Sequence, residues 1–181
     1  MADPSARPEP RVELRPATPA DAGLLHRWRA EREVQRHQRL PDVTVGHLRG
    51  ELERQDHRNL PLSRGDRFQW IVLADGKPAG WVTLAVTSWE HGLAEIGYAL
   101  STPFHGRGIM SRALTTLLPW LFRETILERL EARCSVHHEA SRRVLEQAGF
   151  QREGLLRGCF VVQGERIDHH LSALLRGDLG R

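Results

Sequence analysis

Strand-like and helix-like segments alternate along this chain, and their order predicts a mixed α/β fold with helices packed on one central sheet. Three observations carry this prediction. Short segments that alternate apolar and polar residues recur from residue 12 onward. Residues 109–121 place apolar side chains at helical spacing. A Gln163-Gly164 turn separates the two last strand-like segments, as in a hairpin.

The chain opens with one strand and one helix. Residues 12–15 alternate and predict the first strand. Thr18 has the character of a helix N-cap, because Pro19 follows at the first helical position and Asp21 supplies an acid at the third. We expect this helix to continue through Val34.

A second helix and three strands follow. Thr44 begins the helix, and residues 59–66, which contain a proline and a glycine, predict a loop. The three expected strands, the first two joined by a turn at residues 75–78, span residues 68–73, 80–89 and 94–100.

The C-terminal part begins with the helix at residues 109–121. Pro119 lies inside it and is expected to kink the axis, because proline lacks the N–H that a helix interior needs. Residues 130–136 predict a strand, and residues 139–148 a short helix that ends at Gly149, a favourable residue after a helix.

Length and composition indicate one cytoplasmic domain. We expect a disordered leader over residues 1–10, which are rich in proline, alanine and charge, and a single domain over residues 11–181. The leader has no apolar segment of the signal-peptide type, and no stretch approaches the roughly 20 apolar residues of a membrane span. Two cysteines without CxxC spacing predict neither a zinc site nor a disulfide framework.

The charge pattern does not suggest a nucleic-acid partner. The net charge is +3 and nearly all basic residues are arginines. An arginine-rich codon usage explains this better than affinity for anions, since both signs of charge are interspersed. Ten histidines are present, but no metal-binding spacing occurs, so we expect no metal site.

The most informative segment is Phe104-His105-Gly106-Arg107-Gly108-Ile109-Met110-Ser111-Arg112. It joins an expected strand to an expected helix through a glycine-bearing turn, which is the arrangement of an anion site. It lacks the Gly-Lys-Ser/Thr ending of a Walker A loop. Arg112 also replaces the third glycine of the dinucleotide-binding fingerprint.

This segment resembles motif A of the GNAT acyltransferases. Its particular residues are similar to those of the RimJ/RimL branch, which acetylates N-termini of ribosomal proteins. Two further blocks support the resemblance, which covers nearly the whole chain. Residues 134–150 are similar to the Asn-x-x-Ser and Lys-x-Gly-Phe helix, and residues 153–169 to the closing hairpin. The resemblance implies the GNAT fold, a mixed and mostly antiparallel sheet flanked by helices.

The resemblance also implies acetyl-CoA as cosubstrate. The residues that it assigns to cofactor binding are Ala99, Leu100, His105, Gly106, Arg107, Gly108, Ile109, Met110, Ser111, His138 and Ser141. The chain departs from the family at two of them. His105 replaces a glutamine or arginine, and His138 replaces an asparagine that caps the helix.

Two residues are candidate catalytic groups by the same resemblance. Glu95 matches the family's general base, although a strand residue paired with an arginine is an equal alternative. Ser141 matches the serine whose hydroxyl lies near the cofactor sulfur, although it can also serve only as a helix cap. The usual tyrosine acid is replaced by Leu145, and Tyr98 is expected to pack in the sheet. Cys134 is expected to be a buried small side chain.

We therefore expect an N-acetyltransferase that modifies a primary amine, with the N-terminal α-amino group of a ribosomal protein as the favoured acceptor. The alternatives are a small amine, such as a polyamine or an aminoglycoside, and a non-catalytic acyl-CoA-binding domain. The acceptor pocket is expected to form from residues 28–34, residues 60–67 and the final hairpin. We expect a monomer or a homodimer, with no membrane or nucleic-acid partner.

Overall fold

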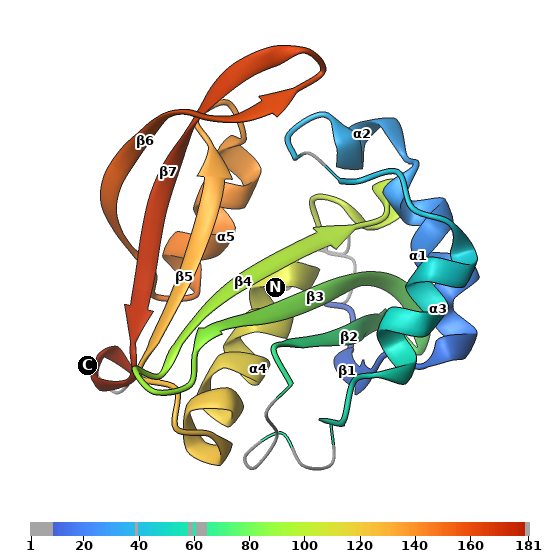
Figure 1. Cartoon of the computed structure of the whole chain (residues 1–181), viewed down its shortest axis with the longest axis horizontal. Helices are drawn as coiled ribbons and strands as arrows, with labels where there is room; N and C mark the ends of the chain where they lie inside the picture. The colour runs from blue at the N-terminus through green and yellow to red at the C-terminus, as the bar shows by residue number, and fades with distance from the viewer. Residues whose placement is uncertain (1–8, 39, 58–59, 61–64, 180–181) are drawn as a thin grey trace, which may run out of the picture.

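The fold is described from a computed structural model, which describes residues 9–38, 40–57, 60 and 65–179. One seven-stranded sheet forms its centre, in the order β1-β2-β3-β4-β5-β7-β6 (Figure 1). The strands are β1 (Val12–Pro16), β2 (Arg67–Ala74), β3 (Lys77–Ser88), β4 (Leu93–Leu100), β5 (Arg129–Ser135), β6 (Gln151–Val162) and β7 (Glu165–Leu175). The α-helices are α1 (Ala22–Arg29), α2 (Arg32–Gln35), α3 (Val45–Glu53), α4 (Ile109–Glu124) and α5 (Glu139–Gln147).

The mixed, mostly antiparallel sheet predicted from the sequence is confirmed. Every pair of neighbouring strands is antiparallel except β4 and β5, which are parallel. The expected hairpin turn lies between β6 and β7, where Gln163 and Gly164 both have positive φ. Within this hairpin, the Asp168 carboxylate accepts a hydrogen bond of 2.6 Å from the Gly158 N–H.

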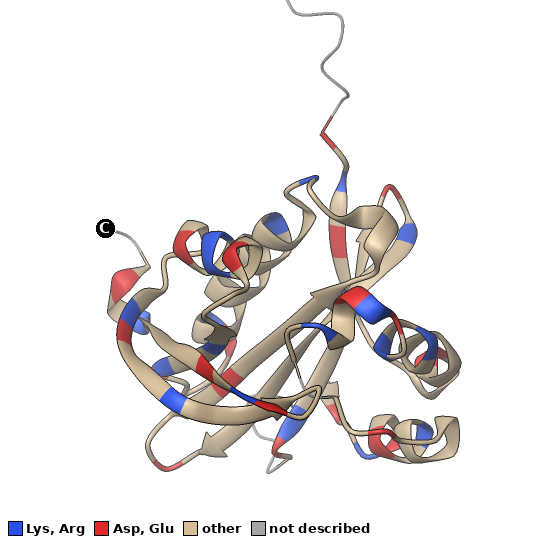
Figure 2. Ribbon diagram, turned by 90° about the horizontal axis from the view of Figure 1, so that it is seen from above, with Lys and Arg blue, Asp and Glu red and all other residues tan. Residues whose placement is uncertain are grey.

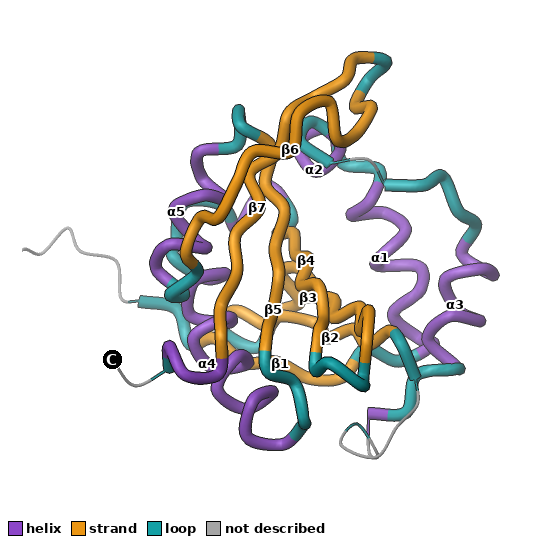
Figure 3. Tube along the Cα trace, turned by 60° about the vertical axis from the view of Figure 1, so that its left-hand side comes forward, coloured by secondary structure: helices purple, strands orange, loops and turns teal. Residues whose placement is uncertain are grey.

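Helices cover both faces of the sheet. The helices α4 and α5 lie on one face, and α1 and α3 lie on the other face of the β1–β4 half (Figure 3). The α4 stripe of Ile109, Ala113, Leu117 and Leu121 is buried, as its helical spacing predicts. The core is therefore two apolar layers, one on each side of the sheet.

One predicted helix differs from the structure. The helix expected to run from Thr18 to Val34 is interrupted at Ala30 and Glu31, because Glu31 is extended with ψ of 130°. Asp21 does accept hydrogen bonds from the N–H and hydroxyl of Thr18, as the capping pattern predicts. The helix α4 continues past Pro119, which lies on its exposed face, where water can reach the carbonyl that proline leaves without a donor.

The N-terminal segment lies against α4, and the surface carries charges of both signs. Most of the expected leader, residues 1–8, lies outside the described residues, while Pro10 is buried and its carbonyl accepts a bond from Arg112. Basic and acidic residues are interspersed over the ribbon (Figure 2). Among the described residues, no helix is long and apolar enough to cross a membrane.

Candidate active site

The two halves of the sheet separate between β4 and β5, which start side by side and then diverge (Figure 1). Their pairing ends at Glu95 and Glu131. A pocket of about 60 Å³ opens where the strands part. It is lined by Ile96, Gly97, Tyr98, Ala132, Arg133, Cys134, Ser135, His138, Ser141 and Leu145, together with His37 and Gln38 from the segment after α2.

The predicted anion loop connects β4 to α4. Gly106 and Gly108 have φ values of +69° and +66°, a conformation that glycine adopts without a steric penalty. Gly108 is the N-cap of α4, so the first N–H groups of the helix have no helical carbonyl to bond. A Cβ on Gly106 would meet nothing within 4 Å, and one on Gly108 would meet only the Arg112 guanidinium. The loop surface is therefore open to an anion.

Three predicted cofactor residues sit at the start of α4. The side chains of Ile109 and Met110 are buried in the core, so only their backbone can face a ligand. The Ser111 hydroxyl donates a 2.6 Å hydrogen bond to the Gln147 side chain. This bond ties the first turn of α4 to the end of α5.

The remaining loop side chains are polar and accessible. Arg107 is 40% exposed and its guanidinium lies 3.5 Å from the Asp75 carboxylate, a pair too exposed and too long to neutralise it strongly. A ring nitrogen of His105 lies 2.9 Å from the Leu100 carbonyl, which fixes the imidazole at the end of β4. Ala99 is buried against the α1 face.

Ser141 and Tyr98 meet in the pocket. The Tyr98 phenol lies 2.9 Å from the Ser141 hydroxyl and 3.2 Å from the Ser141 carbonyl. Burial raises the pKa of Tyr98, so the phenol stays protonated. The sequence predicts packing for Tyr98, which is found, but it does not predict the contact with Ser141. Its position on the same face of β4 as Ile96 was the available signal.

Glu95 lies on the opposite face of β4 from Tyr98, because side chains alternate along a strand. Its carboxylate is 3.1 Å from the guanidinium of Arg133 on β5, and both side chains are about one third exposed. This is the arginine pairing that the sequence left open as an alternative. Arg133, unlike Glu95, also lines the pocket.

His138 occupies the N-cap of α5 and makes no capping hydrogen bond with its side chain, in line with the poor capping expected of histidine. Its ring stacks instead on His37, with centroids 4.1 Å apart and planes 10° from parallel. Burial, aided by the nearby His37, His105 and Arg36, lowers the pKa of His138 to about 4. Burial also lowers the pKa of His37, so both rings of the stack are uncharged at neutral pH.

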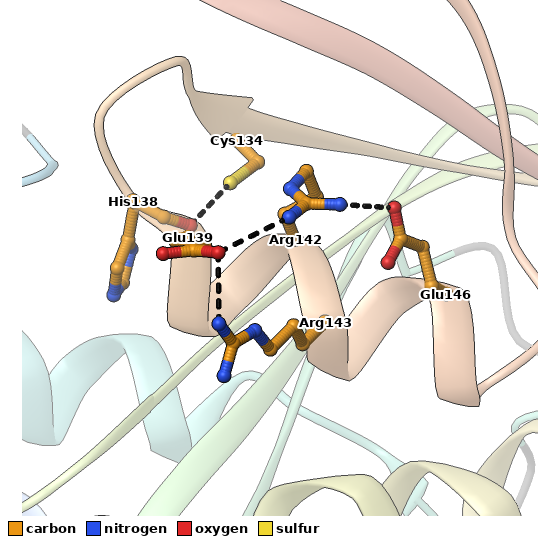
Figure 4. Close-up of polar contacts among 6 residues, drawn as sticks. All are labelled: Cys134, His138, Glu139, Arg142, Arg143 and Glu146. Atoms are coloured by element: carbon orange, nitrogen blue, oxygen red, sulfur yellow. Dashed lines mark hydrogen bonds and ion pairs between the residues drawn. The ribbon is translucent and has the colours of Figure 1, made fainter.

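Cys134 is a buried thiol on β5, as expected. Its sulfur lies 3.4 Å from the His138 carbonyl, to which it donates (Figure 4). Burial raises the pKa of the Cys134 thiol, so it is not a reactive thiolate.

Ion pairs along α5 support the position of Ser141. Glu139 lies 2.8 Å from Arg143 and 3.4 Å from Arg142, and Arg142 lies 2.7 Å from Glu146 (Figure 4). Residues three and four apart are neighbours on a helix surface, and opposite charges at that spacing favour the helix. These pairs compensate in part for the missing cap at His138.

The structure describes part of the segments expected to form the acceptor pocket. Trp28 on α1 stacks on Trp81 of β3 with ring centroids 6.1 Å apart. Leu60 is fully buried, and residues 61–64 lie outside the described part of the chain. No three His, Cys, Asp or Glu residues in the described ranges gather closely enough to hold a metal ion.

The fold and the loop agree with a known family. A family model described as an acetyltransferase (GNAT) domain matches residues 11–151. The chain therefore belongs to the GNAT acetyltransferase family, and it is an N-acetyltransferase.

Individual relatives extend over different parts of the chain. The uncharacterized N-acetyltransferase p20 of Bacillus licheniformis is 29% identical over 92% of this chain and 93% of its own. The [ribosomal protein uS5]-alanine N-acetyltransferase of Escherichia coli is 30% identical over 46% of this chain and 43% of its own. Spermidine N(1)-acetyltransferase of E. coli is 25% identical over 85% of this chain and 80% of its own.

Among solved structures, Mycobacterium smegmatis RimJ in complex with a CoA disulfide has a TM-score of 0.81 and 26% identity. The match covers 94% of this chain and 84% of RimJ.

Proposed function

We propose that this enzyme transfers the acetyl group of acetyl-CoA to the N-terminal α-amino group of a protein, with ribosomal proteins as the favoured class. The observation that best supports this proposal is the pocket between β4 and β5, which contains the paired hydroxyls of Tyr98 and Ser141. The RimJ likeness and the relative that modifies a uS5 alanine support this proposal. We place the reaction in the cytoplasm.

The chain has groups that fit each part of the cosubstrate. The N–H groups of residues 107–111 and the charge of Arg107 suit the pyrophosphate. The backbone of Ala99 and Leu100 lies past the last β4–β5 pair, where a ligand amide can bond in place of a strand. His138 and Ser141 line the pocket in which the thioester would end.

The reaction joins the neutral amine nitrogen to the thioester carbonyl carbon and breaks the carbon–sulfur bond. Ser141 donates a hydrogen bond to the sulfur as it takes the electron pair, and the proton lost by the amine leaves toward water or Glu95. Because an α-amino group has a pKa of about 7.7–8.0, much of it is already neutral near that pH. A carboxylate engaged by an arginine, as Glu95 is, therefore supplies enough base assistance through a water molecule.

The charges near the pocket favour this acceptor over a polyamine. A polyamine is a polycation, and its recognition requires carboxylates that are not already neutralised. Among the described residues, none that lines the pocket is acidic, and the nearby Glu95 carboxylate already lies 3.1 Å from the guanidinium of Arg133.

A turnover screen with acetyl-CoA tests the proposal. The substrates are peptides with a free N-terminal alanine or serine, the same peptides blocked at the N-terminus but containing lysine, spermidine and an aminoglycoside. We expect turnover with free N-termini and none with blocked peptides. A higher kcat/KM for spermidine would assign the small-amine function. Binding of CoA without any turnover would assign the non-catalytic alternative.

A further inference from the structure

The break between α1 and α2 is in contact with the segment that follows β4. Glu31, the extended residue at this break, directs its carboxylate to the segment that follows β4. It accepts hydrogen bonds from the Ser101 hydroxyl at 2.6 Å, the Thr102 N–H at 2.8 Å and the Thr102 hydroxyl at 2.8 Å.

These hydrogen bonds stabilise the ionised form of the Glu31 carboxylate. Burial alone would raise the pKa of Glu31, but the hydrogen bonds from Ser101 and Thr102, with the nearby His105, lower it overall. Hydrogen bonds to a charged group are about twice as strong as neutral ones. Ser101 is buried, so its hydroxyl would lose its partner without Glu31.

Thr102 stands at the entrance to the anion loop. It begins the short 3-10 helix Thr102–Phe104, after which come His105 and Gly106. The N-cap of that helix, Ser101, makes no capping bond of its own, and the Thr102 N–H is bonded by Glu31 instead. Glu31 thus holds the first turn of the connection that carries the anion loop.

We define residues 30–38 as the arm, which is held at both of its ends. Glu31 attaches the arm to the β4–α4 connection, and His37 attaches it to the start of α5 by stacking on His138. His37 and Gln38 line the pocket between β4 and β5. The arm therefore bridges the anion loop and the pocket in which acetyl transfer is proposed.

We infer that Glu31 is a positioning residue that couples cosubstrate binding at the anion loop to the placement of the arm over the acceptor side. This inference rests on the proposed function for the identity of the cosubstrate. An ordered loop holds Glu31 and the arm in place, and a placed arm holds the loop open for the pyrophosphate. We call the contacts of Glu31 with Ser101 and Thr102 the clamp. Because linkage is reciprocal, weakening the clamp must weaken both the binding of the cosubstrate at the loop and the placement of the arm.

The test compares Glu31→Ala with the matched control Glu33→Ala, which removes an exposed acid of the same arm. Hydrogen exchange is measured with and without CoA, and CoA affinity by calorimetry. In Glu31→Ala we expect faster exchange at residues 101–105 in the free protein and about fivefold weaker CoA binding, at the lower end of typical coupling. CoA should protect the arm in the wild type and in Glu33→Ala, and much less in Glu31→Ala.

A KM-against-kcat comparison separates positioning from general damage. Glu31→Ala should raise the KM for acetyl-CoA by a larger factor than it lowers kcat, and Glu31→Gln, which keeps one carbonyl acceptor, should be intermediate. Unchanged exchange at residues 101–105 would refute the clamp. Equal protection of the arm by CoA in Glu31→Ala and wild type would refute the coupling. A wild type that binds no CoA would instead overturn the proposed function, and with it the cosubstrate half of this inference.

Discussion

Replacing Tyr98 with phenylalanine removes one hydroxyl from the pocket and little else. The ring keeps its burial, while the Ser141 hydroxyl loses a neighbour at 2.9 Å and the Ser141 carbonyl one at 3.2 Å. When the phenol donates to the serine oxygen, the proton of Ser141 is free to bond the departing sulfur. Tyr98→Phe should therefore slow acetyl transfer by misdirecting Ser141, without disturbing cosubstrate binding.

The size of the effect follows from the geometry. Removing a hydrogen-bond donor that contacts the reacting atoms directly costs about 2.7–4 kcal/mol in similar sites. Tyr98 acts through Ser141, so we expect a smaller loss in kcat, about tenfold or about 1.4 kcal/mol. Folding stability should fall by about 0.5–1.5 kcal/mol, the usual net value of one hydrogen bond.

The assay is thiol release at saturating acetyl-CoA for Tyr98→Phe, Ser141→Ala and the double variant, with calorimetry for CoA. If Tyr98 works through Ser141, the double variant should be no slower than Ser141→Ala. Thr125→Val is the control, because it removes a buried hydroxyl at the far end of α4. Losses that multiply in the double variant would refute the shared role, and wild-type kcat in Tyr98→Phe would leave Tyr98 with packing alone.

Three further predictions concern the loop, the base and the stacked histidine. Gly108→Val should abolish CoA binding measured by calorimetry, because a β-branched residue is strained at φ of +66° and its side chain crowds the pyrophosphate position; unchanged affinity would remove the loop from the site. Glu95→Gln should lower kcat by no more than about 10²-fold with CoA affinity kept, the lower end of general-base effects, since Arg133 already engages the carboxylate. An unaltered pH–rate profile would exclude Glu95 from the mechanism. The folded protein keeps His138 neutral down to about pH 4, whereas the unfolded chain takes up that proton near pH 6.5, so stability falls as pH drops through this window. Melting temperatures of His138→Asn should therefore decline less between pH 6.5 and 4, and equal declines would contradict the assigned pKa.

Local signals in the sequence predicted the order of strands and helices, the hairpin turn and the anion loop. Gly106 and Gly108 were informative because a turn with positive φ favours glycine wherever it occurs. The periodic apolar residues of α4 were informative because burial selects one helix face. Periodicity failed at Glu31, since Val34 fits the helical pattern whether or not the backbone is continuous.

By itself, the sequence determined the class of fold, the glycine turn between β4 and α4 and the helix that begins near Ser141, because each depends on neighbours within one or two turns of the chain. Only the tertiary structure decided which distant groups meet. Tyr98 reaches Ser141 across 43 residues, and Glu31 reaches Ser101 across 70. Those partners are set by strand order, by the three-residue β4–β5 pairing and by the position of the arm, all of which arise from packing of the whole sheet.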